Sequence, residues 1–264
     1  FLISGYGLMT SYINKGDAYL ESFFSKRMVK LLLPFLLCLL TWIVYNEVTY
    51  WDTFYFVDYF KNKNFGDWLP NTWFVWVIFC AYLLFYLIFK QKFKTLGKLS
   101  IFCMFSIVYY IICANERIPE YWYRSSYAIA LGMAWRYYEK EIISLLNTKI
   151  LSCLIPTIAF ISFVACFPLE LKVFKPLFAC IIFIWSVYNI PNKLDSKLIS
   201  FLALISYEVY LLQQIPMDFV CNYLNITSTI IAVPFIFALD VIMAYIIYIL
   251  YSKIQKLRPF TRQS

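Results

Sequence analysis

The 264-residue chain contains no histidine, which excludes a histidine base, a histidine proton relay and a histidine metal ligand within these residues. Charged residues are also scarce, at 14% of the chain, whereas hydrophobic residues make up 62%. So small a polar fraction leaves too little polar surface to cover a soluble domain of this size. The sequence therefore predicts an integral membrane protein.

Cysteine is present, but no pair of cysteines has the C-x-x-C spacing of a metal or redox site. The 8 cysteines are scattered within apolar runs or at their edges, where cysteine usually serves as a small packing residue. We expect neither disulfides nor a bound metal.

Long apolar runs recur along the chain, and each is long enough to cross a hydrocarbon core of roughly 30 Å at about 1.5 Å per residue. Strands of a membrane barrel would alternate apolar and polar residues, so these runs predict helices. We expect an all-α, polytopic transmembrane bundle that forms a single domain over residues 1–264. The predicted spans are residues 29–46, 73–89, 99–114, 121–136, 150–167, 173–190, 198–220 and 229–252.

Basic residues accumulate on the cytoplasmic side of a membrane, so alternate loops should differ in their content of lysine and arginine. If the first loop is cytoplasmic, the loops on its side hold most of the 23 basic residues, including Lys15, Lys26 and the cluster from Lys90 to Lys98. The net charge of +8 is then explained by orientation next to lipid headgroups, and we expect no nucleic-acid binding. This topology places the C-terminus in the cytoplasm.

The first nine residues, FLISGYGLM, are apolar and do not begin with Met. They have the character of the last turns of a helix that arrives from the far side of the membrane. We therefore expect an N-terminally truncated chain whose intact form has about ten spans.

Four segments carry motifs in a recognisable order. They are Ser4-Gly5-Tyr6 followed by Lys26, Arg27 and Lys30 ahead of Pro34; WFVWVIFCAYLLFY from Trp73; WYRSSYAIALGMAWRYYEK from Trp122, centred on Gly132; and ISYEVYLLQQIP from Ile205. In this order they resemble the membrane acyltransferase-3 family of O-acetyltransferases, over nearly the whole chain.

The resemblance implies a membrane-bound enzyme that moves an acyl group, commonly acetyl, from cytoplasmic acyl-CoA to a hydroxyl of a cell-surface glycan or glycolipid. It implies acetyl-CoA as a co-substrate, with no bound cofactor, and a location in the bacterial inner (cytoplasmic) membrane. It also implies a catalytic histidine in the family's first helix, which we expect upstream of Phe1, so that the chain as it stands is expected to be inactive. The alternative is a non-enzymatic transporter or flippase of glycan assembly, which would share the spans, the charge alternation and the buried acids.

The late motif departs from the family at Gln213, where the family usually has histidine. Glutamine can bind or orient a group but cannot act as a base near neutral pH. A helical wheel at about 100° per residue places Ser206, Tyr210 and Gln213 on one face, with Glu208 pointing away from it. Glu208 is therefore expected to face a different neighbouring helix.

The basic residues Lys26, Arg27 and Lys30 group at one end of a predicted span, where they could bind the phosphates of CoA. A plain positive-inside anchor would show the same cluster, so both interpretations stay open.

Other polar and aromatic residues are candidates for the acceptor site or its support: Trp73, Trp76, Arg124, Tyr207, Glu208, Tyr210, Gln213 and Asp240. Arg124 could contact an anionic or sugar acceptor, or could extend outward to the membrane surface. Glu208 and Asp240 lie near mid-membrane, where an ionisable group indicates a functional site. A structural polar network that holds helices together is the competing interpretation.

The loop from Asn46 to Asn71 is rich in aromatic residues and also contains aspartates. This composition predicts an interfacial segment. Its rings could stack on sugars, although aromatic rings are expected at a membrane boundary in any case.

Overall fold

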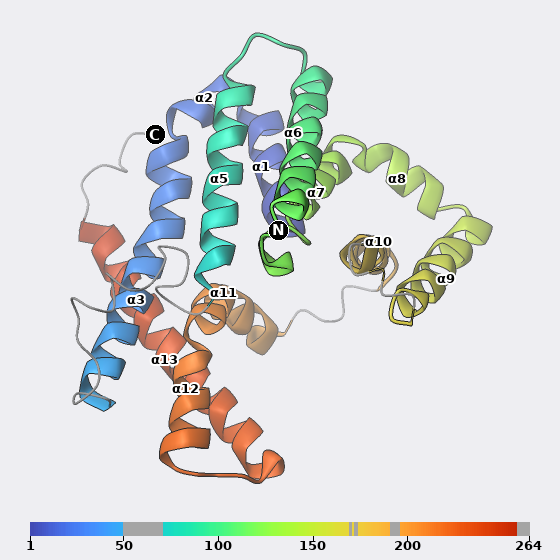
Figure 1. The fold of residues 1–264 in the computed structure, drawn as a ribbon. Coiled ribbons are helices and arrows are strands. Elements are labelled where there is room, and N and C mark those ends of the chain that lie inside the picture. Colours follow the sequence, from blue (N-terminus) through green and yellow to red (C-terminus); the bar gives the residue numbers. More distant parts are fainter. Residues whose placement is uncertain (50–70, 169–170, 172–173, 191–195, 258–264) are drawn as a thin grey trace. The chain divides into compact units, whose positions relative to one another are not determined.

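The computed structural model describes residues 1–49, 71–168, 171, 174–190 and 196–257, so most of the aromatic loop lies outside the described residues (Figure 1). Every secondary-structure element in these ranges is a helix, which confirms the predicted all-α class. The helices are α1 (Leu2–Lys15), α2 (Asp17–Glu21), η1 (Phe24–Met28), α3 (Val29–Thr49), α5 (Thr72–Phe89), α6 (Thr95–Asn115), η3 (Glu120–Trp122), α7 (Ala128–Tyr137), α8 (Glu139–Leu146), α9 (Lys149–Ala165), α10 (Phe174–Asn189), α11 (Lys197–Leu212), α12 (Gln214–Asp218), η5 (Phe219–Tyr223) and α13 (Thr229–Leu257).

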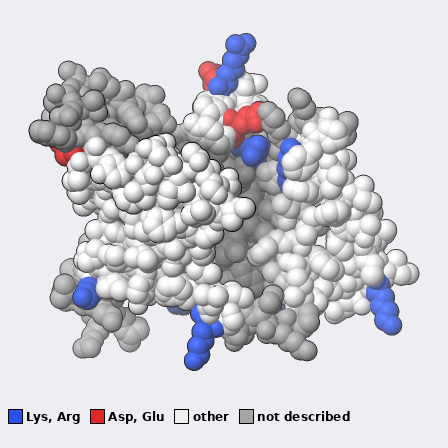
Figure 2. Space-filling view, turned by 90° about the horizontal axis from the view of Figure 1, so that it is seen from below, with Lys and Arg blue, Asp and Glu red and all other residues white. Residues whose placement is uncertain are grey.

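Among the described residues, 4 helices are long and apolar enough to cross a membrane: Phe24–Thr49, Thr72–Phe89, Thr95–Asn115 and Thr229–Gln255. The bent pairs α8 with α9 and α11 with α12–η5 raise the total to 6 if each pair forms one span. Figure 2 shows a face that is largely uncharged, with isolated basic and acidic side chains. Large apolar side chains are exposed on these helices, as expected for contact with lipid. The chain is an integral membrane protein.

Among the described residues, the structure offers 4 to 6 candidate spans instead of the eight predicted. The span predicted at 173–190 corresponds to α10, an apolar helix of 16 residues that is shorter than these candidates. Two further predicted spans differ in where their helices begin or bend. In the span at 121–136, α7 begins at Ala128, and the preceding residues form turns that are stabilised by a hydrogen bond from the Ser126 hydroxyl to the Tyr123 carbonyl. The span at 198–220 bends by 57° where α11 meets α12. Because Pro216 has no N–H to bond the carbonyl of Leu212, the helix breaks at this point.

The described chain divides into two compact units. The first unit contains Phe1–Ser25 and Val77–Lys193, and the second contains Lys26–Trp76 and Leu194–Ser264. The helices η1 and α5 each contribute residues to both units.

Two glycines bring α1 and α7 into backbone contact in the first unit. A Cβ atom added at Gly5 would clash with the carbonyl group of Ile129, and one added at Gly132 would clash with the carbonyl group of Leu2. Backbone atoms cannot turn aside as a flexible side chain can, so both positions require glycine. Small residues permit such close approach between membrane helices. Both glycines belong to the motif segments of the sequence, which therefore have a structural role in packing.

Lys98 joins α1, α5 and α6 in the first unit. Its side chain is 5% exposed, and its Nζ donates hydrogen bonds of 2.7 Å to the carbonyl of Phe89 and 2.8 Å to the hydroxyl of Tyr12. Phe89 is the last residue of α5, where carbonyl groups lack partners within the helix and the helix dipole is negative. Lys98, which the sequence placed in a basic loop, is thus a buried cap of α5.

The helices α3, α11 and α13 pack against one another to form the core of the second unit. Their buried faces follow the helical repeat: Leu31, Phe35, Cys38 and Trp42 on α3; Ile205, Glu208, Leu211 and Leu212 on α11; and Ala232, Asp240, Ala244 and Ile247 on α13. Two acids, Glu208 and Asp240, therefore occupy core positions of this three-helix unit.

Candidate active site

A basic turn lies at the start of the second unit. Lys26 and Arg27 belong to the π-helical turn η1, which runs directly into α3, and Lys30 lies in the first turn of α3. The side chains of Lys26 and Lys30 are exposed, and that of Arg27 is half-buried. Three cations at one end of a membrane-spanning helix can bind phosphate groups through charge-assisted hydrogen bonds. Irregular π-helical turns are also frequent at functional sites.

Tyr207 attaches α11 to this end of α3. Its hydroxyl donates a hydrogen bond of 2.9 Å to the backbone carbonyl of Leu31. Pro34 lacks the N–H that would otherwise bond the carbonyl of Lys30, so the first turn of α3 has fewer hydrogen bonds than a regular helix. The bond from Tyr207 therefore fixes the segment that follows the basic turn.

Two carboxyl groups are buried in the core of the second unit. The side chain of Glu208 on α11 is 3% exposed and that of Asp240 on α13 is 5% exposed. Cys38, on α3, is buried in the same core, because α3 packs against both α11 and α13. The three helices therefore place polar groups from each of them in one otherwise apolar core.

Each acid has an oxygen atom with no hydrogen-bond partner among the described residues, namely Oε2 of Glu208 and Oδ1 of Asp240. The ion pairs that the described residues form involve other side chains. A buried polar atom without a hydrogen-bond partner costs about 1–3 kcal/mol, so these two oxygens lower the stability of the folded protein. This cost weakens the interpretation of the acids as a fully bonded structural network and favours a functional role, as for other ionisable groups in membrane segments.

Other residues of the late motif lie beside the first turn of α5. The Asn71 side chain donates a hydrogen bond of 3.3 Å to the backbone carbonyl of Tyr210, and the ring of Phe74 lies 4.9 Å from that of Tyr210. Gln213 is half-buried and occupies the break between α11 and α12. The single helical wheel used for the sequence prediction therefore ends at Gln213.

The tryptophan candidates lie on the first turns of α5. Trp73 and Trp76 are both half-buried, and the ring of Trp76 packs 6.3 Å from that of Phe35 on α3. The ring of Trp76 therefore contacts protein in the described structure.

The structure shows the surroundings of Arg124, one of the acceptor-site candidates. The residue lies on the turn before α7, and its Nη1 atom is 3.8 Å from Oε2 of Glu120. The two side chains are 42% and 48% exposed, and a surface ion pair of this kind contributes little to stability. Arg124 belongs to the first unit, whereas Glu208 and Asp240 belong to the second.

Sequence reasoning missed a polar cluster around Glu139 in the first unit. One carboxylate oxygen accepts hydrogen bonds of 2.7 Å from Tyr6 and 2.9 Å from Tyr188, and the other accepts one of 2.6 Å from Arg136. The indole of Trp135 donates a further bond of 2.9 Å to Tyr188. The sequence signal that could have pointed to this cluster was Tyr6, the aromatic residue of the Ser4-Gly5-Tyr6 motif.

The family model described as an acyltransferase domain matches residues 1–249, and the match runs through both units. The chain belongs to the acyltransferase-3 family. No curated protein and no solved structure matches it in the corresponding comparisons. As a membrane acyltransferase, the protein has to bind a donor and an acceptor, and the second unit contains two features of suitable chemistry: the basic turn at Lys26, Arg27 and Lys30, and the buried acids Glu208 and Asp240.

Proposed function

We propose that the protein is an O-acyltransferase that transfers an acyl group, most simply acetyl, from cytoplasmic acyl-CoA to a hydroxyl of a cell-surface glycan or glycolipid. The observation that carries this proposal is the match to the acyltransferase family over residues 1–249. The family resemblance implies a bacterial inner membrane as the location. The alternation of basic residues between loops would place the C-terminus in the cytoplasm.

The basic turn is the proposed donor site. CoA carries phosphate groups, and Lys26, Arg27 and Lys30 bring three cations to one end of α3. Two of these side chains are exposed and can reach a soluble ligand, while the half-buried Arg27 is held more firmly. The hydrogen bond from Tyr207 to Leu31 supports this arrangement by fixing the adjoining backbone.

In the proposed reaction, the acceptor oxygen attacks the thioester carbonyl carbon, the new C–O bond forms, and the C–S bond breaks. The proton of the acceptor hydroxyl is taken by a base and ends on the departing CoA thiol. The 264 residues contain no histidine, so a histidine base would have to come from outside them. Glu208 and Asp240 are the proposed acceptor-side or supporting groups, together with Trp73, Trp76, Tyr210 and Gln213.

The test uses membranes that contain the protein together with any residues encoded upstream of Phe1, acetyl-CoA labelled in the acetyl group, and native cell-envelope glycan. We expect the label to appear in the glycan as an alkali-labile ester. Arg27→Ala, or Lys26→Ala with Lys30→Ala, should raise the KM for acetyl-CoA at least tenfold, whereas the exposed Lys92→Ala should leave it unchanged.

If transfer by Arg27→Ala and by the double variant equals that of the wild type, the basic turn is not the donor site. If the wild-type protein transfers neither acetyl nor a longer acyl group to any cell-envelope fraction, the proposed function is wrong.

A further inference from the structure

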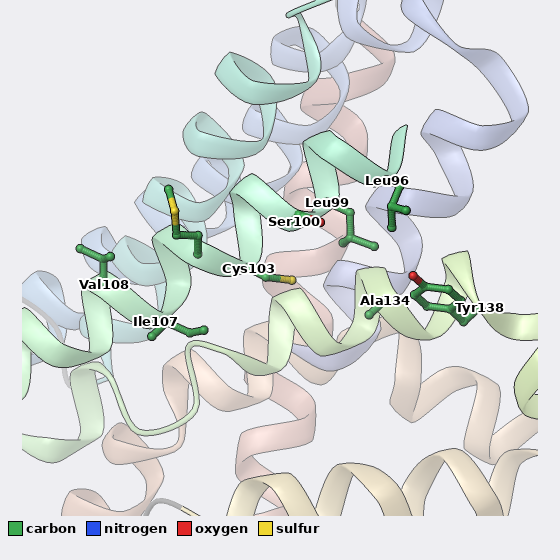
Figure 3. Close-up of a pocket in the computed structure, with 9 residues that line it drawn as sticks. Leu96, Leu99, Ser100, Cys103, Ile107, Val108, Ala134 and Tyr138 are labelled. Carbon is green, nitrogen blue, oxygen red and sulfur yellow. The ribbon is translucent and has the colours of Figure 1, made fainter. Parts of the chain in front are cut away.

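An apolar groove of about 430 Å³ lies between α6 and α7 in the first unit (Figure 3). One face of α6, from Leu96 through Cys103 to Val108, forms most of the groove, and Ala134 and Tyr138 close its other side. None of the lining residues is charged. The proposed acyl transfer makes no use of this groove.

The groove has the length of one membrane leaflet. Leu96 and Val108 are 12 positions apart on a continuous helix, which corresponds to about 18 Å at 1.5 Å per residue. The hydrocarbon core is roughly 30 Å thick, so a groove of this length extends a little more than halfway through it. Met104 and Ile107 are 54% and 58% exposed, so the groove is open sideways. A hydrocarbon chain can enter it from the bilayer.

The two ends of the groove differ in chemistry. Leu96 and Tyr138 lie at one end, and Ile107 and Val108 lie at the other (Figure 3). The first end carries the hydroxyl groups of Ser100 and Tyr138, and the second is purely apolar.

Basic residues adjoin the hydroxyl-bearing end. Lys94 lies two positions before Leu96, and Lys140 lies two positions after Tyr138; both lysines are exposed. The nearby carboxylate of Glu139 is neutralised by Arg136, whose Nη1 atom donates to it at 2.6 Å. Glu141, next to Lys140, is also exposed, and the two lysines outnumber it. The end therefore has a cation available for a negatively charged group.

We propose that this groove is a binding site for an anionic phospholipid, with one acyl chain along α6 and the phosphate headgroup at Lys94 and Lys140. A zwitterionic lipid would supply the same chain without the net negative charge, so charge complementarity decides in favour of an anionic headgroup. Lysines near a membrane surface attract anionic lipid headgroups. The lipid would fill the space between α6 and α7 and so stabilise the first unit.

The experiment places the protein in phosphatidylcholine nanodiscs that contain a trace of phosphatidylglycerol with a photoreactive diazirine at the end of one acyl chain. After illumination, labelled peptides are mapped by mass spectrometry. We expect label to concentrate at Ile107 and Val108, and we expect unlabelled phosphatidylglycerol, but not added phosphatidylcholine, to reduce it at least fivefold.

Two pairs of variants test the chain and headgroup positions separately. Cys103→Trp fills the groove and should abolish the concentrated label, whereas Ile111→Trp, on the same helix but outside the groove, should keep it. Lys94→Gln with Lys140→Gln should remove the preference for the anionic lipid, whereas Lys15→Gln with Lys149→Gln should retain it. The unfolding temperature of each variant verifies that it is folded.

Label spread evenly over exposed apolar residues of other helices, such as Phe160 of α9, with no preference for phosphatidylglycerol, would overturn the proposal. Displacement of the probe by palmitoyl-CoA and not by phosphatidylglycerol would also overturn it, because the groove would then belong to an acyl donor. Both outcomes can be distinguished from a failure of acyl transfer, since the assay does not depend on activity.

Discussion

The hydroxyl of Tyr207 donates a hydrogen bond to the backbone carbonyl of Leu31, and this bond links α11 to the first turn of α3. Tyr207→Phe removes the bond and keeps the ring, so we expect a loss of about 1 kcal/mol of stability. If the basic turn binds acyl-CoA, the variant should also raise the KM for acyl-CoA severalfold while kcat changes little. Steady-state kinetics with purified protein separates these two constants.

Tyr248→Phe, on α13 of the same unit, is the matched control, because its recorded contact among the described residues is ring packing on Tyr251. It should leave the KM for acyl-CoA unchanged. An equal KM in wild type and Tyr207→Phe would show that Tyr207 does not position the donor site.

The buried acids should affect activity more than stability. Glu208→Gln and Asp240→Asn keep the size of each side chain and remove its charge, and the oxygens Oε2 and Oδ1 have no hydrogen bond to lose among the described residues. We expect unfolding free energies within about 1 kcal/mol of wild type or higher, together with at least a tenfold loss of acyl transfer. The exposed Glu47→Gln, in the same unit, should change neither quantity.

A large loss of stability in Glu208→Gln or Asp240→Asn, with activity lost in proportion to unfolded protein, would contradict this prediction. It would show that the carboxylates hold the three helices together.

The contact between α1 and α7 should tolerate no side chain at either glycine. In Gly5→Ala and Gly132→Ala, the added methyl group meets the backbone of Ile129 or Leu2, so we expect losses of about 1–3 kcal/mol from overpacking. Gly97→Ala on α6 is the control, because its nearest neighbour, the Cβ of Phe93, is 3.9 Å away. It should be neutral or stabilising by up to about 1 kcal/mol, since alanine favours helix. Thermal unfolding in detergent measures all three, and equal stability of all three variants would rule out the tight contact.

Replacement of Lys98 by methionine should destabilise the first unit although it removes a buried charge. Lys98→Met leaves the Phe89 carbonyl and the Tyr12 hydroxyl without their described donor, which we expect to cost about 1.5–3 kcal/mol. The exposed Lys92→Met should cost less than about 0.5 kcal/mol. If both variants unfold at the same temperature, the hydrogen bonds of Lys98 to α5 and Tyr12 do not stabilise the protein.

Local patterns were sufficient to predict the helical class. Runs such as 73–89 and 229–252 coincide closely with α5 and the apolar part of α13, because a helix in lipid depends on the hydrophobicity of its own residues. Prediction failed where short-range chemistry interrupts a run. Hydrogen bonding by Ser126 keeps the residues before α7 in turns, and Pro216 breaks the helix after Leu212.

In the candidate site, too, some features could be predicted from local sequence and others could not. Helical spacing put Glu208 on a face away from Gln213, but spacing within α11 cannot show that Asp240 and Cys38 come from other helices to the same core. Likewise, nothing near Lys98 in the sequence indicates that its partners are Tyr12 and Phe89.

The sequence by itself determined that the chain enters a membrane, that it does so as helices, and that four segments follow the order of motifs in the acyltransferase-3 family. These properties depend on the hydrophobicity and order of neighbouring residues. The tertiary structure alone decided that Gly5 packs on the backbone of α7, that Tyr207 bonds to α3, and that two acids share a core with one thiol. Such contacts depend on which helix faces meet. Residues that are far apart in the sequence jointly determine which faces pair.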